Sequence, residues 1–122
     1  MSVTFKKESE NLFVIQVDGI FEFENQKELE NKAREQVDRS GKVKCLILAE
    51  KFSGWGKEGD WGDLTFMHEY DPYIGKIAVV AEGKWKDEML MFFGAGRRQA
   101  AVEFFYESEE KDARDWLGSS NE

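Results

Sequence analysis

Val43-Lys44-Cys45-Leu46-Ile47-Leu48-Ala49 is a stretch that has no polar side chain from Cys45 onward. A short run that is apolar on both faces is typical of a strand in the middle of a sheet that helices cover on both sides. The same pattern returns in Lys76-Ile77-Ala78-Val79-Val80-Ala81. Two such strands with a helical pattern between them predict neighbouring parallel strands, and therefore an α/β fold.

The elements around these two strands alternate in type. The first two expected strands are separated by the polar turn Glu8-Ser9-Glu10-Asn11, which predicts a β-hairpin. The predicted order is β-β-α-β-α-β-α-β-α, which gives a single small mixed, mostly parallel sheet with right-handed crossovers and helices covering it. The expected strands are Val3–Phe5, Leu12–Gly19, Val43–Ala49, Lys76–Ala81 and Ala100–Phe105, and the expected helices begin at Asn25, Asp60, Lys84 and Ser108.

Length and composition limit the class of protein. The chain has 122 residues without a repeat or linker, so we expect one domain over residues 1–122. Its only cysteine, Cys45, excludes an intrachain disulfide, and no apolar run is long enough for a signal peptide or a membrane span. These features predict a cytoplasmic protein. The net charge of −8 repels phosphate backbones and argues against a nucleic-acid partner.

Residues that could carry catalysis are scarce. Cys45 lies within an apolar strand, where a thiol is usually inert packing, and His68 is the only histidine. The carboxylates lie on predicted helix faces and turns rather than paired in a pocket. Gly54, Gly56 and Gly59 match a dinucleotide-binding spacing, but they do not follow the strand directly and acidic residues flank them. The sequence therefore predicts a protein that is not an enzyme and has no metal or cofactor.

The unusual feature is an excess of aromatic and methionine residues in the middle of the chain. The predicted helix Lys84–Phe93 contains Met89-Leu90-Met91-Phe92-Phe93. Five consecutive positions span more than one helical turn, so they cannot all face one core. Two interpretations remain: the helix is clamped between the sheet and a neighbouring helix, or it lines a groove for an apolar ligand.

Several short segments together carry a family resemblance. Gly54-Trp55 after a central strand, Lys76–Ala81 followed by Trp85, Phe104-Phe105, and Ala113-Arg114-Asp115-Trp116-Leu117 resemble the SpoIIAA-like family over nearly the whole chain. This resemblance implies a fold similar to STAS domains and to the lipid-binding CRAL-TRIO domains. It also implies a small bacterial cytosolic protein that binds a lipid-like or other apolar ligand near its two central helices, which open at a membrane surface.

Two functional hypotheses follow. The first is a module that binds a small apolar or lipid-like ligand, with an Arg97 side chain facing a headgroup. The second is a STAS-type protein-interaction regulator, similar to anti-sigma-factor antagonists and switched by phosphorylation at Ser53, although no aspartate precedes that serine as it does in those proteins. The expected partners are accordingly the ligand, a membrane surface, a protein, or a second copy of the chain in a homodimer. The expected ligand-binding residues are Phe52, Trp55, Phe66, Tyr70, Trp85, Met89, Phe92 and Arg97.

Overall fold

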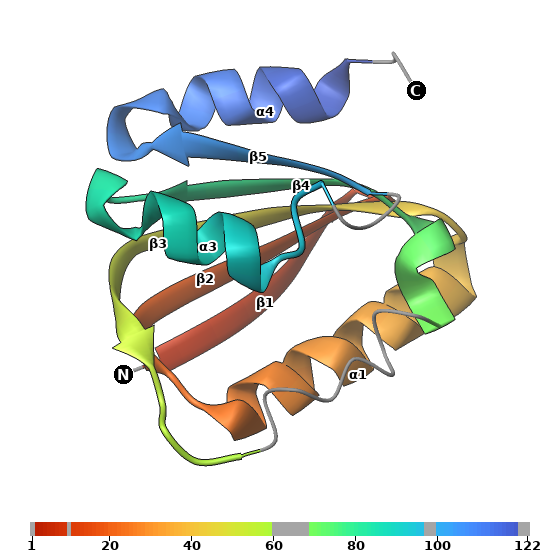
Figure 1. Cartoon of the computed structure of the whole chain (residues 1–122). Coiled ribbons are helices and arrows are strands. Elements are labelled where there is room, and N and C mark those ends of the chain that lie inside the picture. Colours follow the sequence, from red (N-terminus) through yellow and green to blue (C-terminus); the bar gives the residue numbers. More distant parts are fainter. Residues whose placement is uncertain (1, 10, 60–68, 97–99, 120–122) are drawn as a thin grey trace.

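One five-stranded sheet organises residues 2–9, 11–59, 69–96 and 100–119, which are the residues that this computed structural model describes. The β1 and β2 strands pair antiparallel, and each later pair is parallel. The predicted α/β class, with a mixed, mostly parallel sheet and an N-terminal hairpin, is therefore confirmed. The strands lie side by side in chain order (Figure 1): β1 (Ser2–Ser9), β2 (Leu12–Phe21), β3 (Val43–Trp55), β4 (Ile74–Ala81) and β5 (Ala101–Tyr106).

Helices cover both faces of the sheet. The α1 helix (Phe23–Ser40) and the α3 helix (Lys86–Phe92) lie on one face, and α4 (Glu110–Gly118) lies on the other (Figure 1). Of the helix predicted from Asp60, only its last residues fall within the described chain, where Glu69 and Tyr70 are helical. Three short 3-10 helices complete the fold: η1 (Asp71–Tyr73), η2 (Gly83–Trp85) and η3 (Glu107–Glu109).

Successive side chains of the central strands point into two different cores, as the apolar character of both strand faces predicts. Ile47 and its register partner Val79 pack on the face that α1 and α3 cover. Leu46 and its partner Ala78 pack under α4 with Leu117. Because both sides of β3 and β4 are sealed, these strands need no polar alternation.

The β3 strand is longer than the sequence predicts. It continues past Ala49 to Trp55, where it pairs with Phe21 at the end of β2. The extension was missed because Glu50, Lys51 and Ser53 are exposed and give the segment the polarity of a loop.

Two predicted helix starts also need correction. The α1 helix begins at Phe23, and Asn25 is its third residue rather than its N-cap: the Asn25 Oδ1 atom accepts a 2.8 Å hydrogen bond from the backbone N–H of Glu22. The last helix is not capped by Ser108. Instead η3 precedes α4, and the side chain of Glu109 accepts a 2.8 Å hydrogen bond from the backbone N–H of Tyr106.

Two lysines hold the C-terminal end of α4 against the sheet. The Lys76 Nζ atom donates to the carbonyl oxygen of Trp116 at 2.8 Å and to the Ser119 Oγ atom at 2.6 Å. The Lys44 Nζ atom, on the paired residue of β3, donates to the carbonyl oxygen of Leu117. Ammonium groups at this position satisfy the last carbonyls of a helix and favour its negative end.

The buried stripe of α4 is narrower than predicted. Ala113 and Leu117 are buried at 0% and 2% exposure, whereas Trp116 is only partly buried. One face of Trp116 meets Phe105, with the ring centroids 6.0 Å apart, and the Lys76 ammonium lies 4.9 Å from its ring centroid. The indole therefore covers the buried lysine rather than filling the core.

Candidate functional site

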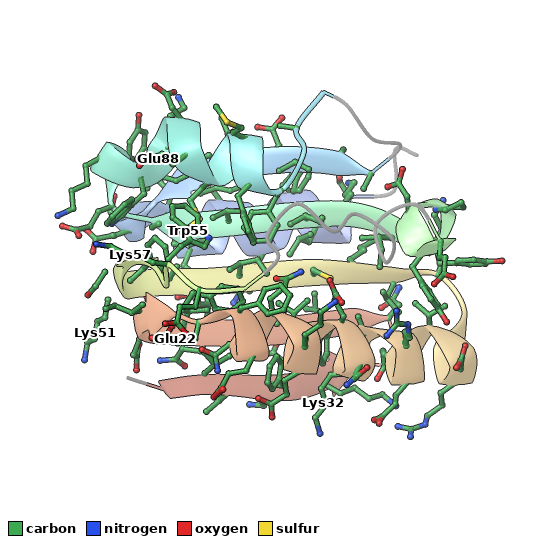
Figure 2. The ribbon with its side chains drawn as sticks, turned by 60° about the horizontal axis from the view of Figure 1, so that its bottom comes forward. Glu22, Lys32, Lys51, Trp55, Lys57 and Glu88 are labelled. Carbon is green, nitrogen blue, oxygen red and sulfur yellow. The ribbon has the colours of Figure 1, made fainter. Side chains whose placement is uncertain are left out.

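An aromatic cluster closes the carboxyl end of the parallel strands. Phe52 and Trp55 come from β3, Trp85 from η2, and Phe92 from α3. The ring centroid of Phe52 lies 4.8 Å from the ring centroid of each tryptophan. The ring centroids of Trp55 and Phe92 lie 5.3 Å apart. Figure 2 places Trp55 between the α1 and α3 ribbons. Edge-to-face packing of this kind adds to the stability that comes from burial alone.

Beneath this cluster lies a small apolar cavity. It measures about 20 Å³, which is room for about one water molecule. A cavity of this volume has no space for a fatty acid or lipid tail. The lining residues come from β2, α1, β3 and α3 and are all apolar: Ile15, Val17, Phe21, Leu29, Ile47, Ala49, Phe52, Trp55, Met89, Phe92 and Phe93.

The apolar run of α3 is divided between the core and the surface. Met89 is buried at 2% exposure, while Met91 points outward at 68% exposure. Leu90, Phe92 and Phe93 are partly buried. The prediction that one core cannot hide all five side chains is confirmed, and the exposed member is a flexible methionine.

Five of the eight predicted ligand-binding residues come together here. Phe52, Trp55, Met89 and Phe92 line the cavity, and Trp85 packs against the first two. Phe66 and Arg97 fall outside the described residues, so their role in ligand binding stays a prediction.

Tyr70 does not belong to this cluster. It precedes η1 and β4, with its ring centroid 6.1 Å from that of Tyr73, whereas Trp85 follows β4. Residues that precede and follow one strand lie at opposite ends of the sheet. The structure therefore separates Tyr70 from the five residues that come together, and its role in ligand binding stays a prediction.

Ser53 lies within β3. Its side chain is exposed, and the preceding Phe52 is buried at 5% exposure. The pairing of β3 with β2 shifts register between Phe52 and Gly54, so the side chains do not alternate strictly at Ser53. Because the serine side chain is exposed, a phosphate on it would lie at the surface.

Sequence reasoning missed two members of the cluster and one polar atom. Phe21 packs on Phe92 at 6.3 Å between centroids, and Phe93 packs on the same ring at 5.0 Å. Phe21 could have been found by extending the second predicted strand beyond Gly19. The indole Nε1 atom of Trp85 is buried and has no hydrogen-bond acceptor among the described residues.

The described part of the chain has few features of other kinds of site. It holds no group of three or more His, Cys, Asp or Glu residues that could bind a metal ion. Cys45, the only cysteine, is buried within β3. No helix among the described residues is long and apolar enough to cross a membrane.

The comparisons with known proteins agree on one family. The family model described as SpoIIAA-like matches residues 12–118. No curated protein matches the chain.

Solved structures show the same fold along most of their length. A protein of the DUF3478 family from Shewanella loihica PV-4, described as having a SpoIIAA-like fold, superposes with a TM-score of 0.67 at 16% identity, over 95% of this chain and 92% of that chain. The anti-sigma factor antagonist SpoIIAA in its unphosphorylated form gives 0.65 at 14% identity, over 98% and 100%. The Bacillus cell fate determinant SpoIIAA in the phosphorylated form gives 0.52 at 13% identity, over 91% and 97%.

Proposed function

Because this chain belongs to the SpoIIAA-like family, we propose that it is a bacterial, cytoplasmic protein-interaction regulator of the anti-sigma-factor-antagonist kind, and not an enzyme. The main support is the likeness in fold to SpoIIAA over essentially both whole chains. The closed cavity points in the same direction, because a site with room for one water molecule offers little to a substrate.

The outer surface of α3 is the contact surface that this proposal favours. Met91 is 68% exposed there, next to a cluster that seals the inner side of the same helix. Asp87 and Glu88 lie in the first turn of α3 and are exposed. A flexible apolar side chain beside charged residues suits a protein interface, since methionine adapts its shape to different partners.

Ser53 is the residue at which we propose that binding is switched. Its exposed side chain is accessible to a kinase, and a phosphate would add about 1.5–2 negative charges at the end of β3. Those charges would act at the surface, because the serine side chain is exposed. Phosphorylation at this position remains a prediction.

The test is calorimetric titration of the purified chain with each anti-sigma factor encoded in the same genome. One of them should bind with a dissociation constant of about 1 μM or tighter, and Met91→Glu should weaken that binding by about ten-fold or more. Ile20→Glu is the matched control, because Ile20 is also an exposed apolar residue, at 43%, but lies on β2. Equal weakening by both variants would rule out the α3 surface, and the absence of any binding factor would rule out the proposal.

The serine switch has its own test. Ser53→Glu should weaken binding to the same anti-sigma factor, while Ser53→Ala should keep the affinity of the unmodified chain. Mass spectrometry of protein purified from the native host should show a phosphorylated fraction at Ser53. Unmodified Ser53 together with full binding by Ser53→Glu would exclude the switch.

A small apolar or lipid-like ligand is the second candidate, and the entirely apolar lining of the cavity favours it. The ligand could enter only if α3 moved away from Phe21 and Leu29, because the cavity holds about 20 Å³ as it stands. Native mass spectrometry of gently purified protein should then show a bound apolar species, and fatty acids should raise the melting temperature. Neither effect is expected if the cluster stays closed. Homodimer formation and contact with a membrane surface also remain predictions.

A further inference from the structure

A second concave surface lies at the opposite end of the sheet from the aromatic cluster. It is an open groove of about 430 Å³ between the last turn of α1 and the segment that leads into β4. Figure 1 shows η1 beside the C-terminal end of α1. The lining residues are Val37, Asp38, Gly41, Glu69, Tyr70 and Tyr73, and the groove is called the tyrosine groove below.

The charge of the tyrosine groove is negative. Among the described residues, its lining includes the carboxylates of Asp38 and Glu69 and no cationic side chain. The α1 helix also ends here, at Ser40, and the unsatisfied carbonyls at a helix C-terminus carry a negative partial charge. The net charge of the whole chain, −8, also attracts cations. The groove is therefore complementary to a cation.

The aromatic rings of the groove indicate which kind of cation it would bind. The rings of Tyr70 and Tyr73 lie 6.1 Å apart at 56°, and Tyr73 is 48% exposed. On one side, the guanidinium carbon of Arg34 lies 5.6 Å from the ring centroid of Tyr70, and an Arg34 nitrogen lies 3.9 Å from the Glu69 carboxylate. The protein thus already combines a guanidinium group with a tyrosine ring and a carboxylate at this place.

A second tyrosine and a second carboxylate, Tyr73 and Asp38, line the same groove. The Asp38 side chain forms no hydrogen bond or ion pair with a described residue. A guanidinium group is planar, stacks on an aromatic face and pairs with a carboxylate through two parallel N–H groups, which an ammonium group cannot do. Arginine therefore suits Tyr73 and Asp38 better than lysine does.

We propose that the tyrosine groove binds an arginine side chain presented by a protein partner, with the guanidinium group stacked on Tyr73 and paired with Asp38. That the arginine comes from a protein partner rests on the proposed function, because only that function implies such a partner. The preference of the groove for a guanidinium group does not depend on it.

The direct test uses a short peptide rather than the partner. The isotope-labelled chain is titrated by NMR with the blocked peptide Gly-Arg-Gly-Arg-Gly at low salt, and with the same peptide carrying uncharged citrulline in place of arginine. The arginine peptide should shift the amide signals of Asp38, Gly41 and Tyr73 and leave those of Trp55 and Trp85 unchanged. Equal shifts from the citrulline peptide, or shifts spread over the whole surface, would overturn the proposal.

Substitutions separate the groove from the general negative charge of the chain. Asp38→Asn and Tyr73→Leu should each weaken peptide binding by about two- to five-fold. Glu50→Gln removes the same charge from an exposed position on β3, beyond Ala49, whose register partner Ala81 ends β4, and it should leave the affinity unchanged. Equal weakening by Asp38→Asn and Glu50→Gln would show unspecific attraction and overturn the proposal.

The same variants distinguish the groove from the proposed function. Full binding of an anti-sigma factor by Asp38→Asn and Tyr73→Leu would overturn the groove as a partner site and leave the regulator proposal intact. Groove-specific binding of the arginine peptide without binding of any anti-sigma factor would support the guanidinium preference and remove the proposed function.

Discussion

The indole rings of Trp55 and Trp85 meet edge to face, with their centroids 5.9 Å apart and their planes at 86°. This contact joins the end of β3 to the 3-10 turn that starts α3. Phe52 touches both rings, so the three side chains hold α3 against the sheet. The aromatic side chains of this segment also cover the cavity beneath them.

Removing the centre of this cluster should destabilise the protein strongly. Phe52 is 5% exposed and contacts both tryptophans, so Phe52→Ala should lower the free energy of unfolding by about 3–5 kcal/mol. Met91→Ala, on α3, is the control. It should lower the free energy of unfolding by less than about 1 kcal/mol because Met91 is 68% exposed. Urea unfolding followed by tryptophan fluorescence measures both. A small effect of Phe52→Ala would mean that the cluster does not carry the packing assigned to it.

The cavity should accept the two extra carbon atoms of a valine on one strand, whereas the neighbouring strand should not. Ala49 lines the cavity, so Ala49→Val should fill it and raise the free energy of unfolding by about 0.5–1 kcal/mol. Ala81, its register partner on β4, is equally buried but does not line the cavity, so Ala81→Val should overpack the core and cost about 1–3 kcal/mol. Similar costs for both variants in thermal or urea unfolding would contradict the position of the cavity.

The buried ammonium of Lys76 should be important for docking α4. It is 6% exposed and donates to the carbonyl oxygens of Trp116 and Ser119 and to the Ser119 hydroxyl. Lys76→Met keeps most of the side-chain volume but removes the ammonium donor, and the Trp116 carbonyl then accepts only from Ser119. This loss should cost about 2–3 kcal/mol. Lys51→Met, an exposed lysine on β3, should change stability by under about 0.5 kcal/mol. Comparable urea midpoints for the two variants would show that α4 docks without the lysine.

The ion pair between Glu8 and Arg114 should make a small, pH-dependent contribution. The hydrogen bond from Arg114 is the main cause that lowers the pKa of Glu8; burial opposes it, and the positive charges of Arg114 and Lys6 add smaller lowering effects. Because the folded state favours the ionised carboxyl, the stabilisation is present at neutral pH and is lost as the pH falls through the lowered pKa. The pair is partly exposed to solvent, so Glu8→Gln should cost about 0.2–1 kcal/mol near neutrality.

Unfolding of wild type and Glu8→Gln at about pH 7 and about pH 2 checks this sign, since a glutamate is ionised at the first pH and protonated at the second. Glu50→Gln, which removes an exposed carboxyl of β3, is the control. A Glu8→Gln cost that persists undiminished at the acidic pH would contradict the role of the charge.

The sheet was predictable because its signal is local. The apolar runs around Ile47 and Val79 identify strands covered on both faces, and the alternation of elements gives their parallel order. The end of β3 was not predictable in the same way, because Ser53 and its charged neighbours are exposed on an extended strand and look like a loop. Its pairing with β2, which a single strand's sequence does not record, keeps the segment extended as far as Trp55.

The candidate site was predicted in part for a similar reason. The aromatic residues of β3, η2 and α3 lie at the carboxyl end of the sheet, where the chain order brings them together. Tyr70 was grouped with these residues although the predicted strand Lys76–Ala81 separates it from Trp85, and the two residues therefore lie at opposite ends of the sheet. Lys76 as a helix cap was also missed, because the interaction spans 40 residues along the chain and leaves no local pattern.

The most direct measurement is titration calorimetry of the chain with the anti-sigma factors of its own genome. The account predicts stoichiometric binding to one of them, weakened by Met91→Glu and kept by Ile20→Glu. Failure of every factor to bind, together with a fatty acid or phospholipid retained by the purified protein in native mass spectrometry, would contradict it.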